Sequence, residues 1–274
     1  MYTSTFALAA ASALLPSVLG TDWTGPSWYL PVGTHITKLA TTMKVPAIPP
    51  NDLDGQTLFV WPGIQPGNAL QEDGGDPAAV GNGVLQPVLT YGPSCVPGDH
   101  PEDQWYISGV YVGGGGNPDF DGCFGGDVMQ VAPEDLVACT MELKQGTAST
   151  WDQTCINLSN NNQTVTYELD LAGQLQSSGE LMVENPTDQS NADWNFPCFF
   201  YNTVVVTDKP MDASICVLPE SDKAYKSKNS ALSEDGLTCT LGGIAIFNPD
   251  KPAPEINDAD LSIRARRAQY LSYL

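Results

Sequence analysis

The sequence predicts an all-β protein built as a two-sheet antiparallel sandwich. Runs of apolar, β-branched and aromatic residues recur at intervals of about 8–12 residues, which is the spacing typical of sandwiches. Turn-forming residues are plentiful, with 26 glycines and 22 prolines among 274 residues. No convincing amphipathic helix precedes the C-terminal segment. With 42% hydrophobic residues, a chain of this length suits one sizeable domain.

The expected strands follow one another through the chain. They are 56–61, 83–91, 104–112, 127–131, 136–143, 150–158, 164–171, 179–184, 196–207, 214–218, 224–228 and 238–247. A run of four glycines, Gly113–Gly116, is followed by Asn-Pro-Asp and not by a helix, so we expect a loop there and no phosphate site. We assign 51–250 to the sandwich and 251–274 to a tail in which 258–274 is the one candidate helix.

The N-terminal region divides into two parts. An apolar run, Phe6–Leu19, ends in Val-Leu-Gly and predicts a signal peptide over 1–20 and a secreted protein. The next segment, 21–50, is Pro-rich and locally basic, with no acidic residue between Trp23 and Pro50. It is interpreted either as an edge strand over 27–32 with a linker, or as a propeptide.

Charge and cysteine usage exclude several kinds of protein. The net charge is -21, from 32 acidic and 11 basic residues, which argues against nucleic-acid and membrane partners. Seven cysteines without a CxxC pair, and only two histidines, argue against a metal site. In a secreted chain they predict three disulfides and one free thiol. We expect Cys216 to pair with Cys239 and Cys95 with Cys123. No cofactor motif is present.

Two short motifs predict glycosylation. Asn157-Leu-Ser and Asn162-Gln-Thr are N-glycosylation acceptors. They flank a polar Asn run that predicts an exposed hairpin tip.

Paired carboxylates are the strongest candidates for chemistry. Glu180 and Glu184 lie four residues apart in an expected strand, so they share a face with Met182, while Leu181 and Val183 point to the other face. Such a face is either a wet outer surface or a functional groove. His35 and His100 lie in Pro- and Gly-rich segments that do not suit a histidine-based triad.

Several segments, in order, resemble the fungal glutamic peptidases, the eqolisin family. These segments are Leu58-Phe-Val-Trp-Pro-Gly-Ile64, Val84-Leu-Gln86, Asp103-Gln-Trp-Tyr106, Glu134-Asp-Leu136, Gly179-Glu-Leu-Met-Val-Glu184 and Phe196-Pro-Cys-Phe-Phe-Tyr-Asn-Thr-Val-Val-Val206. In the same order, they are similar to six segments of the family: Ala-Trp-Val-Gly-Ile, Ile-Leu-Gln, Ala-Trp-Tyr, Glu/Pro-Gly-Asp followed by a strand, Ala-Glu-Trp-Ile-Val-Glu and Pro-Phe-Ala-Asp-Phe-Gly-Thr-Val-Thr-Phe. The resemblance runs from about residue 56 to residue 207.

The resemblance implies a concanavalin A-like sandwich whose concave face carries the catalytic pair. Gln86 matches the family's catalytic glutamine and Glu180 its catalytic glutamate, which acts as general base on a water. Trp61, Trp105 and Glu184 are expected to line the substrate groove. Two departures stand beside the pair: the family has Gln-Thr-Gly where this chain has Gln86-Pro87-Val88, and a tryptophan where this chain has Leu181.

Three functions remain open from the sequence. The first is a secreted hydrolase of glutamic-peptidase type that cleaves peptides at acidic pH with the Gln86–Glu180 pair. The second keeps the fold but cyclises, isomerises or adds to a small metabolite in the groove. The third is a non-catalytic lectin-like or cell-wall-binding module.

Overall fold

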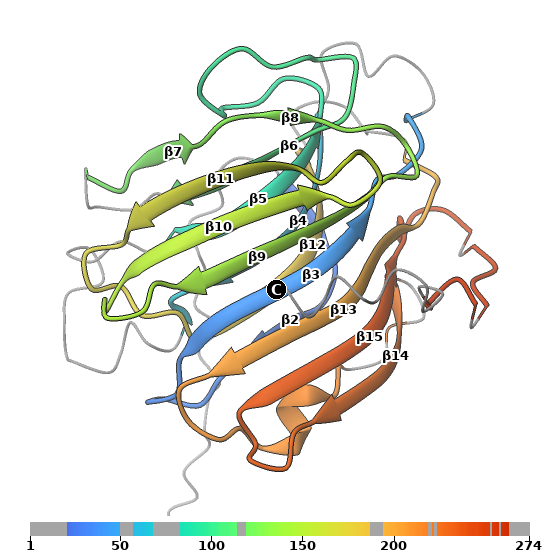
Figure 1. Ribbon diagram of the computed structural model, residues 1–274. Coiled ribbons are helices and arrows are strands. Elements are labelled where there is room, and N and C mark those ends of the chain that lie inside the picture. The colour runs from blue at the N-terminus through green and yellow to red at the C-terminus, as the bar shows by residue number, and fades with distance from the viewer. Residues whose placement is uncertain are drawn as a thin grey trace, which may run out of the picture.

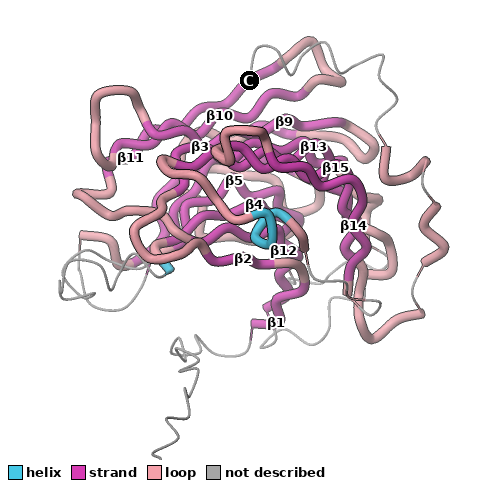
Figure 2. The backbone as a smooth tube through the Cα atoms, turned by 90° about the horizontal axis from the view of Figure 1, so that it is seen from below, coloured by secondary structure: helices cyan, strands magenta, loops and turns pink. Residues whose placement is uncertain are grey.

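The computed structural model describes residues 21–49, 57–67, 83–113, 119–186, 194–218, 221, 224–252, 254–257 and 259–262. These residues form two antiparallel β-sheets stacked face to face, which confirms the predicted sandwich (Figures 1 and 2). The predicted signal peptide and most of the candidate C-terminal helix lie outside the described residues. In the described part of the chain, no helix is both long and apolar enough to span a bilayer.

The first sheet carries the candidate site. Among the described residues it has eight strands, in the order β1-β12-β4-β5-β6-β7, with β2 also beside β12 and β8 beside β6. Its strands are β1 (Thr21–Thr24), β2 (Ser27–Tyr29), β4 (Leu58–Gln65), β5 (Val84–Tyr91), β6 (Tyr106–Gly113), β7 (Gly122–Gly125), β8 (Met129–Gln130) and β12 (Ser178–Pro186).

The second sheet forms the front layer in Figure 1. Its order is β11-β10-β9-β3-β13-β15-β14. The strands are β3 (Ile36–Lys44), β9 (Leu136–Leu143), β10 (Thr150–Asn157), β11 (Gln163–Asp170), β13 (Cys198–Thr207), β14 (Tyr225–Leu232) and β15 (Thr238–Ile246).

Side-chain alternation divides the apolar residues of the first sheet between two clusters. Leu181 and Val183 of β12 lie in the main core between the sheets, as expected from the alternation. Met182, between them, lies on the outer face in a second, smaller cluster. That cluster comprises Trp61, Val88, Val96, Val110 and Met182. The outer face of this sheet is therefore partly covered and apolar.

The segment 21–50 contributes three strands. β1 and β2 flank β12 at one edge of the first sheet, while β3 lies between β9 and β13 in the second. Gly25 joins β1 to β2 where a Cβ atom would lie 2.0 Å from the Leu181 carbonyl oxygen, so only glycine fits. Proteolytic removal of 21–50 would take out a central strand of the second sheet, so we expect the segment to stay in the folded protein.

Three disulfides stabilise the sandwich. The two predicted pairs, Cys95–Cys123 and Cys216–Cys239, are confirmed, and the third joins Cys139 to Cys155 across β9 and β10. The remaining thiol, Cys198, is free and buried. Disulfides of this number indicate an extracellular protein.

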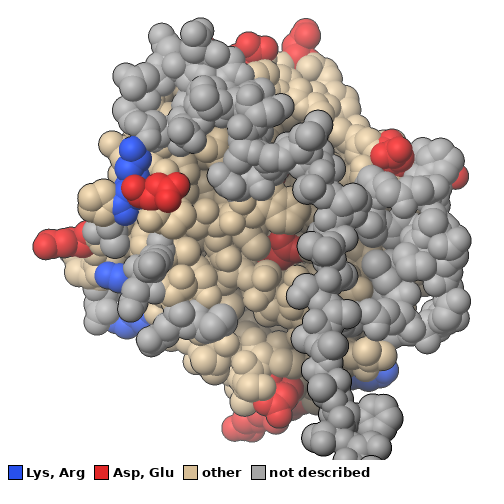
Figure 3. All heavy atoms as spheres, turned by 180° about the vertical axis from the view of Figure 1, so that it is seen from behind, with Lys and Arg blue, Asp and Glu red and all other residues tan. Residues whose placement is uncertain are grey.

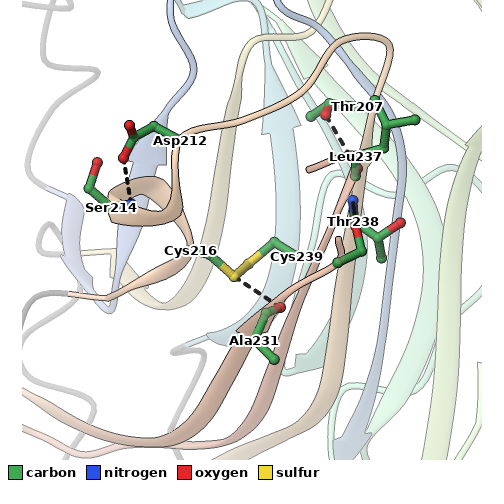
Figure 4. The surroundings of a disulfide bond; sticks show 9 residues. Thr207, Asp212, Ser214, Cys216, Ala231, Leu237, Thr238 and Cys239 are labelled. Atoms are coloured by element: carbon green, nitrogen blue, oxygen red, sulfur yellow. Dashed lines mark hydrogen bonds between the residues drawn. A yellow bond between two sulfur atoms is a disulfide. The ribbon is translucent and has the colours of Figure 1, made fainter. Parts of the chain in front are cut away.

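One expected strand, 214–218, is wrong. Ala213–Cys216 forms a short 3₁₀ helix, η2, because the Asp212 side chain accepts a hydrogen bond from the Ser214 amide, 2.8 Å away, and caps the turn. Figure 4 shows this turn held to β15 by the Cys216–Cys239 disulfide. The strand β3, Ile36–Lys44, lies beyond the expected edge strand 27–32, where the sequence pattern predicts no strand.

Candidate active site on the outer face of the first sheet

The strand register places Glu180 and Gln86 in one row of the first sheet. Glu180 of β12 lies opposite Gly63 of β4. The β4–β5 ladder pairs Val60 with Leu89 and Ile64 with Leu85, and the same register sets Gly63 opposite Gln86. Residues opposite each other on neighbouring strands project from the same face. The two side chains therefore share the outer face, with backbones two strand spacings apart, about 9.5 Å.

Gly63 and Trp61 form the floor between the two polar side chains. A Cβ atom at Gly63 would lie 2.7 Å from Cζ3 of the Trp61 indole and 2.8 Å from the Val84 side chain. The indole therefore lies over the glycine, in the space that a side chain at position 63 would occupy. Trp61 is 1% exposed, which makes it a fixed element of the site.

Two prolines face each other beside this row. By the same register Pro62 of β4 lies opposite Pro87 of β5, and neither can donate a ladder hydrogen bond. The β4–β5 ladder is correspondingly interrupted between Val60 and Ile64. Pro87 still occupies its register on the other side, opposite Gly109 of β6. The departure from the family's Gln-Thr-Gly thus opens the ladder next to Gln86 without removing it from the sheet.

Glu180 is a buried carboxyl group with one free oxygen. It is 2% exposed, and its Oε1 accepts a hydrogen bond from Nε2 of Gln65. Its Oε2 is buried and has no hydrogen-bond partner. Burial raises the pKa of Glu180 to about 7, against the stabilising Gln65 hydrogen bond and with a smaller contribution from the Glu184 charge.

Gln86 has the same feature on the other side of Gly63. It is 5% exposed, and its Oε1 is buried without a hydrogen-bond partner. Buried polar atoms in folded proteins are nearly always hydrogen-bonded. Two such atoms in one row of one sheet face indicate a position for a bound group that is itself polar.

Glu184 holds the side chains of Trp61 and Trp23 in place. Its Oε2 accepts a hydrogen bond from the Trp61 indole, 2.9 Å away. Burial raises its pKa, while the indole N–H groups of Trp61 and Trp23 oppose the shift. Trp23 lies opposite Glu184 in the β1–β12 register, is 46% exposed, and packs edge-to-face on Trp61 with ring centroids 6.0 Å apart. Glu184 therefore orients two aromatic side chains.

Trp105 does not line this face. It is 1% exposed, lies in the core between the sheets and packs against Tyr91, with its indole donating to the Ala47 carbonyl at 3.3 Å. Its expected place in the groove is corrected, because side chains of adjacent residues point to opposite faces and Tyr106 takes the outer one. Leu181, the other departure from the family pattern, also lies in the inner core.

Figure 3 shows the face of the molecule opposite that of Figure 1, with acidic atoms near its centre next to uncharged surface of the described residues. The basic and most other acidic groups drawn there lie toward the periphery. Within the described ranges, no group of three or more His, Cys, Asp or Glu side chains is arranged to hold a metal ion. The polar side chains placed on this face are the carboxyl groups of Glu180 and Glu184 and the amides of Gln65 and Gln86.

Gln65, Gly63 and Trp23 are site residues that the sequence did not single out. Gln65 and Gly63 could have been found by alternation, since they follow Trp61 at intervals of two along β4 and so share its face. Trp23 could not, because it lies in a separate strand that reaches β12 only through the tertiary fold.

Neither a protein-family model nor a curated protein sequence matches this chain. Solved structures do. Two structures of scytalido-glutamic peptidase are similar to this chain. The complex with a peptide-based transition-state analogue has 13% sequence identity and a TM-score of 0.45, and the complex with a transition-state analogue inhibitor has 14% identity and a TM-score of 0.46. SCP-B, a member of the eqolisin family in complex with the tripeptide Ala-Ile-His, shows 13% identity and a TM-score of 0.44. Each match covers 81% of this chain and 98% of the other. The likeness is one of overall architecture.

The two glycosylation motifs differ in accessibility. Asn157 is fully buried, its Nδ2 donates to Asp135 Oδ2 at 2.8 Å and its Oδ1 accepts from the Ser159 amide at 2.9 Å. Asn162 is exposed at the β10–β11 hairpin tip. A glycan on Asn157 would break both hydrogen bonds.

We therefore expect secreted protein to carry carbohydrate on Asn162 and none on Asn157. Peptide mapping after enzymatic deglycosylation in ¹⁸O-water reports each site separately. The Asn162→Gln variant, as a control, should run at the mass of the unmodified chain. Carbohydrate on Asn157 in folded protein would contradict this prediction.

Proposed function

We propose that the protein hydrolyses peptide bonds on the outer face of the first sheet, with Glu180 as general base and Gln86 as the group that holds the water and the oxyanion. The observation that carries the proposal is the pair of buried, unpartnered oxygens, Glu180 Oε2 and Gln86 Oε1, in one row across Gly63. The resemblance of the flanking segments to glutamic peptidases agrees with it.

Each side chain has a chemical part in the reaction. Glu180 Oε2 takes a proton from a water whose oxygen attacks the carbonyl carbon, while Gln86 Oε1 accepts the water's second O–H. The Gln86 amide N–H donates to the oxygen that becomes negative. The carbon–nitrogen bond then breaks, and the proton held by Glu180 passes to the leaving nitrogen. Glu180 ends ionised, as it began.

A second candidate function is the conversion of a small apolar molecule without hydrolysis. The observation that favours it is the lining, since Trp61, Met182, Val88 and Val110 surround the row with apolar surface. Below the pKa of Glu180, about 7, the carboxyl group is protonated and can act as an acid on a bound alkene or carbonyl. No observation on the described residues favours the lectin-like module.

Oxygen labelling separates the two candidates. Hydrolysis in ¹⁸O-water adds one labelled oxygen to each new carboxyl group, whereas a cyclase or isomerase leaves the substrate mass unchanged. We expect labelled peptide products when a peptide library is incubated with the protein. Wild-type protein that cleaves no peptide over about pH 3–9, an interval that includes the whole titration of a carboxyl group with a pKa of about 7, would refute the hydrolase.

The variant Gln86→Leu is expected to lower kcat about a hundredfold, because it removes both the water acceptor and the oxyanion donor. Steady-state cleavage of one library peptide measures the loss. Gln130→Leu, an exposed glutamine on β8 of the same sheet, is the matched control and should leave kcat unchanged. Equal activity in the Gln86 variant would remove this residue from the mechanism.

A further inference from the structure

Gln65 is fixed in the site by hydrogen bonds of both its backbone and its side chain. It lies on β4 opposite Ser178 of β12, two residues from Gly63 and on the same face. Its backbone carbonyl accepts from the Ser177 amide at 3.0 Å and from the Ser178 hydroxyl at 3.4 Å. Gln65 is 9% exposed and its Nε2 donates a hydrogen bond to Glu180 Oε1, so the side chain points toward Glu180.

The hydrogen bond distinguishes the two oxygens of Glu180. Oε1 receives the Gln65 amide, whereas Oε2 is buried and unpartnered. In the amide orientation of the structure, Nε2 donates to Oε1, so Oε1 is the acceptor for as long as this hydrogen bond is kept. The proton of the neutral form therefore belongs on Oε2, the oxygen available to a bound group.

We propose that Gln65 is the positioning residue of this site. Its hydrogen bond to Oε1 fixes the Glu180 side chain and leaves Oε2 for proton exchange. Because Gln65 does not ionise, Glu180 titrates as a single carboxyl group and not as one of a coupled pair. The inference rests on the proposed function in taking Glu180 as the reacting group. In this proposal Gln65 acts on the reaction only through its hydrogen bond to Glu180.

The neighbours of Glu180 define what else bears on its titration. Gln65 and Trp61 on β4, Gln86 on β5 and Ser27 on β2, which lies opposite Glu180, carry no charge. On β12 itself, Glu184 is the one charged group among the described residues that acts on it. A second carboxyl group at position 65 would change the titration of Glu180. When two carboxyl groups are hydrogen-bonded to each other, the singly ionised pair is stabilised because the two groups share the remaining proton. The first proton of such a pair is therefore lost at a lower pH than the proton of a single buried carboxyl group.

Two substitutions at position 65 therefore have opposite effects. Gln65→Glu should move the acidic inflection of the kcat/KM profile to lower pH, with at least tenfold more activity than wild type at pH 4. Gln65→Met keeps the length of the side chain but removes the N–H that donates to Glu180. Since this hydrogen bond lowers the pKa of Glu180, the acidic inflection of this variant should move to higher pH. A defect in packing alone would shift both variants in the same direction or neither. Gln130→Glu, which adds a carboxyl group on the exposed side of β8, should leave the profile unchanged.

Infrared difference spectra measure the titration of Glu180 without turnover. Wild type and each position-65 variant are compared with the same protein carrying the additional Glu180→Gln substitution. These spectra separate the failure of this inference from failure of the proposed function. Opposite shifts in a protein that cleaves nothing would support the role of Gln65 and remove the hydrolase. Cleavage with the same inflection in wild type, Gln65→Glu and Gln65→Met would overturn the role of Gln65 and leave the hydrolase intact. Circular dichroism confirms that each variant is folded.

Discussion

Replacing Glu180 with glutamine is expected to lower kcat/KM for peptide cleavage by about a thousandfold, because the variant has no group that can take the proton of the attacking water. The glutamine side chain has the same shape, and its carbonyl oxygen can still accept the hydrogen bond from Gln65. The loss then belongs to chemistry and not to a disturbed sheet. Single-turnover cleavage of a labelled peptide is the appropriate measurement, since it is unaffected by slow product release.

Glu184→Gln is the matched control for this variant. It neutralises the neighbouring carboxyl group on the same face of β12 and keeps an oxygen that can accept from the Trp61 indole. We expect kcat/KM within about threefold of wild type, since a neutral acceptor preserves the orientation of the indole at the loss of roughly 0.6 kcal/mol. Full activity in Glu180→Gln, or equal losses in both variants, would show that the reacting carboxyl group lies elsewhere.

Stability provides an internal check on the same variant. The pKa of Glu180 is raised from 4.5 to about 7 in the folded protein, so its contribution is fully present below pH 4.5 and is lost as the pH rises through 7. Glutamine does not ionise. Glu180→Gln should therefore gain free energy of unfolding relative to wild type above pH 7, by up to roughly 3 kcal/mol, and show no such gain at pH 4.

The pH dependence of cleavage is the second large effect. If the ionised form of Glu180 is the base, about 1% of the protein is active at pH 5 and about half at pH 7, so kcat/KM should rise roughly 50-fold over that interval and level off above pH 8. The sign follows from the raised pKa of about 7, which keeps the carboxyl group protonated in acid. A neutral optimum is thus expected in place of the acidic one that the sequence suggested.

The profile of kcat/KM for one peptide across about pH 4–9, roughly three units below and two units above the pKa of about 7, measures this. Glu184→Gln controls for the neighbouring charge, which raises the pKa of Glu180 and whose removal should shift the inflection slightly toward acid. Activity that increases toward pH 4 would contradict Glu180 as the base. It would instead identify the protonated carboxyl group as the active form, so that cleavage would proceed by acid catalysis.

Local sequence patterns were sufficient for the sandwich and for the division of β12 into two faces. The alternation Glu180-Leu181-Met182-Val183-Glu184 sends Leu181 and Val183 to the core and the other three outward, because successive side chains in a strand must point to opposite faces. The same rule, applied to turn residues and β-branched runs, located most of the strands. It failed at 214–218, where a capped turn competed with a short apolar run, and it missed β3.

The sequence by itself predicted most of the strands and the shared face of Glu180 and Glu184, and the two disulfide pairs expected from it, Cys95–Cys123 and Cys216–Cys239, are confirmed. Only the tertiary structure decided which residues meet Glu180. Register across β12, β4 and β5 joins positions more than ninety residues apart in the chain (86 and 180) through Gly63, and no local pattern encodes pairing at that separation. Burial likewise depends on the assembled sheets, so the raised pKa of Glu180, the role of Gln65 and the inward position of Trp105 followed from the fold alone.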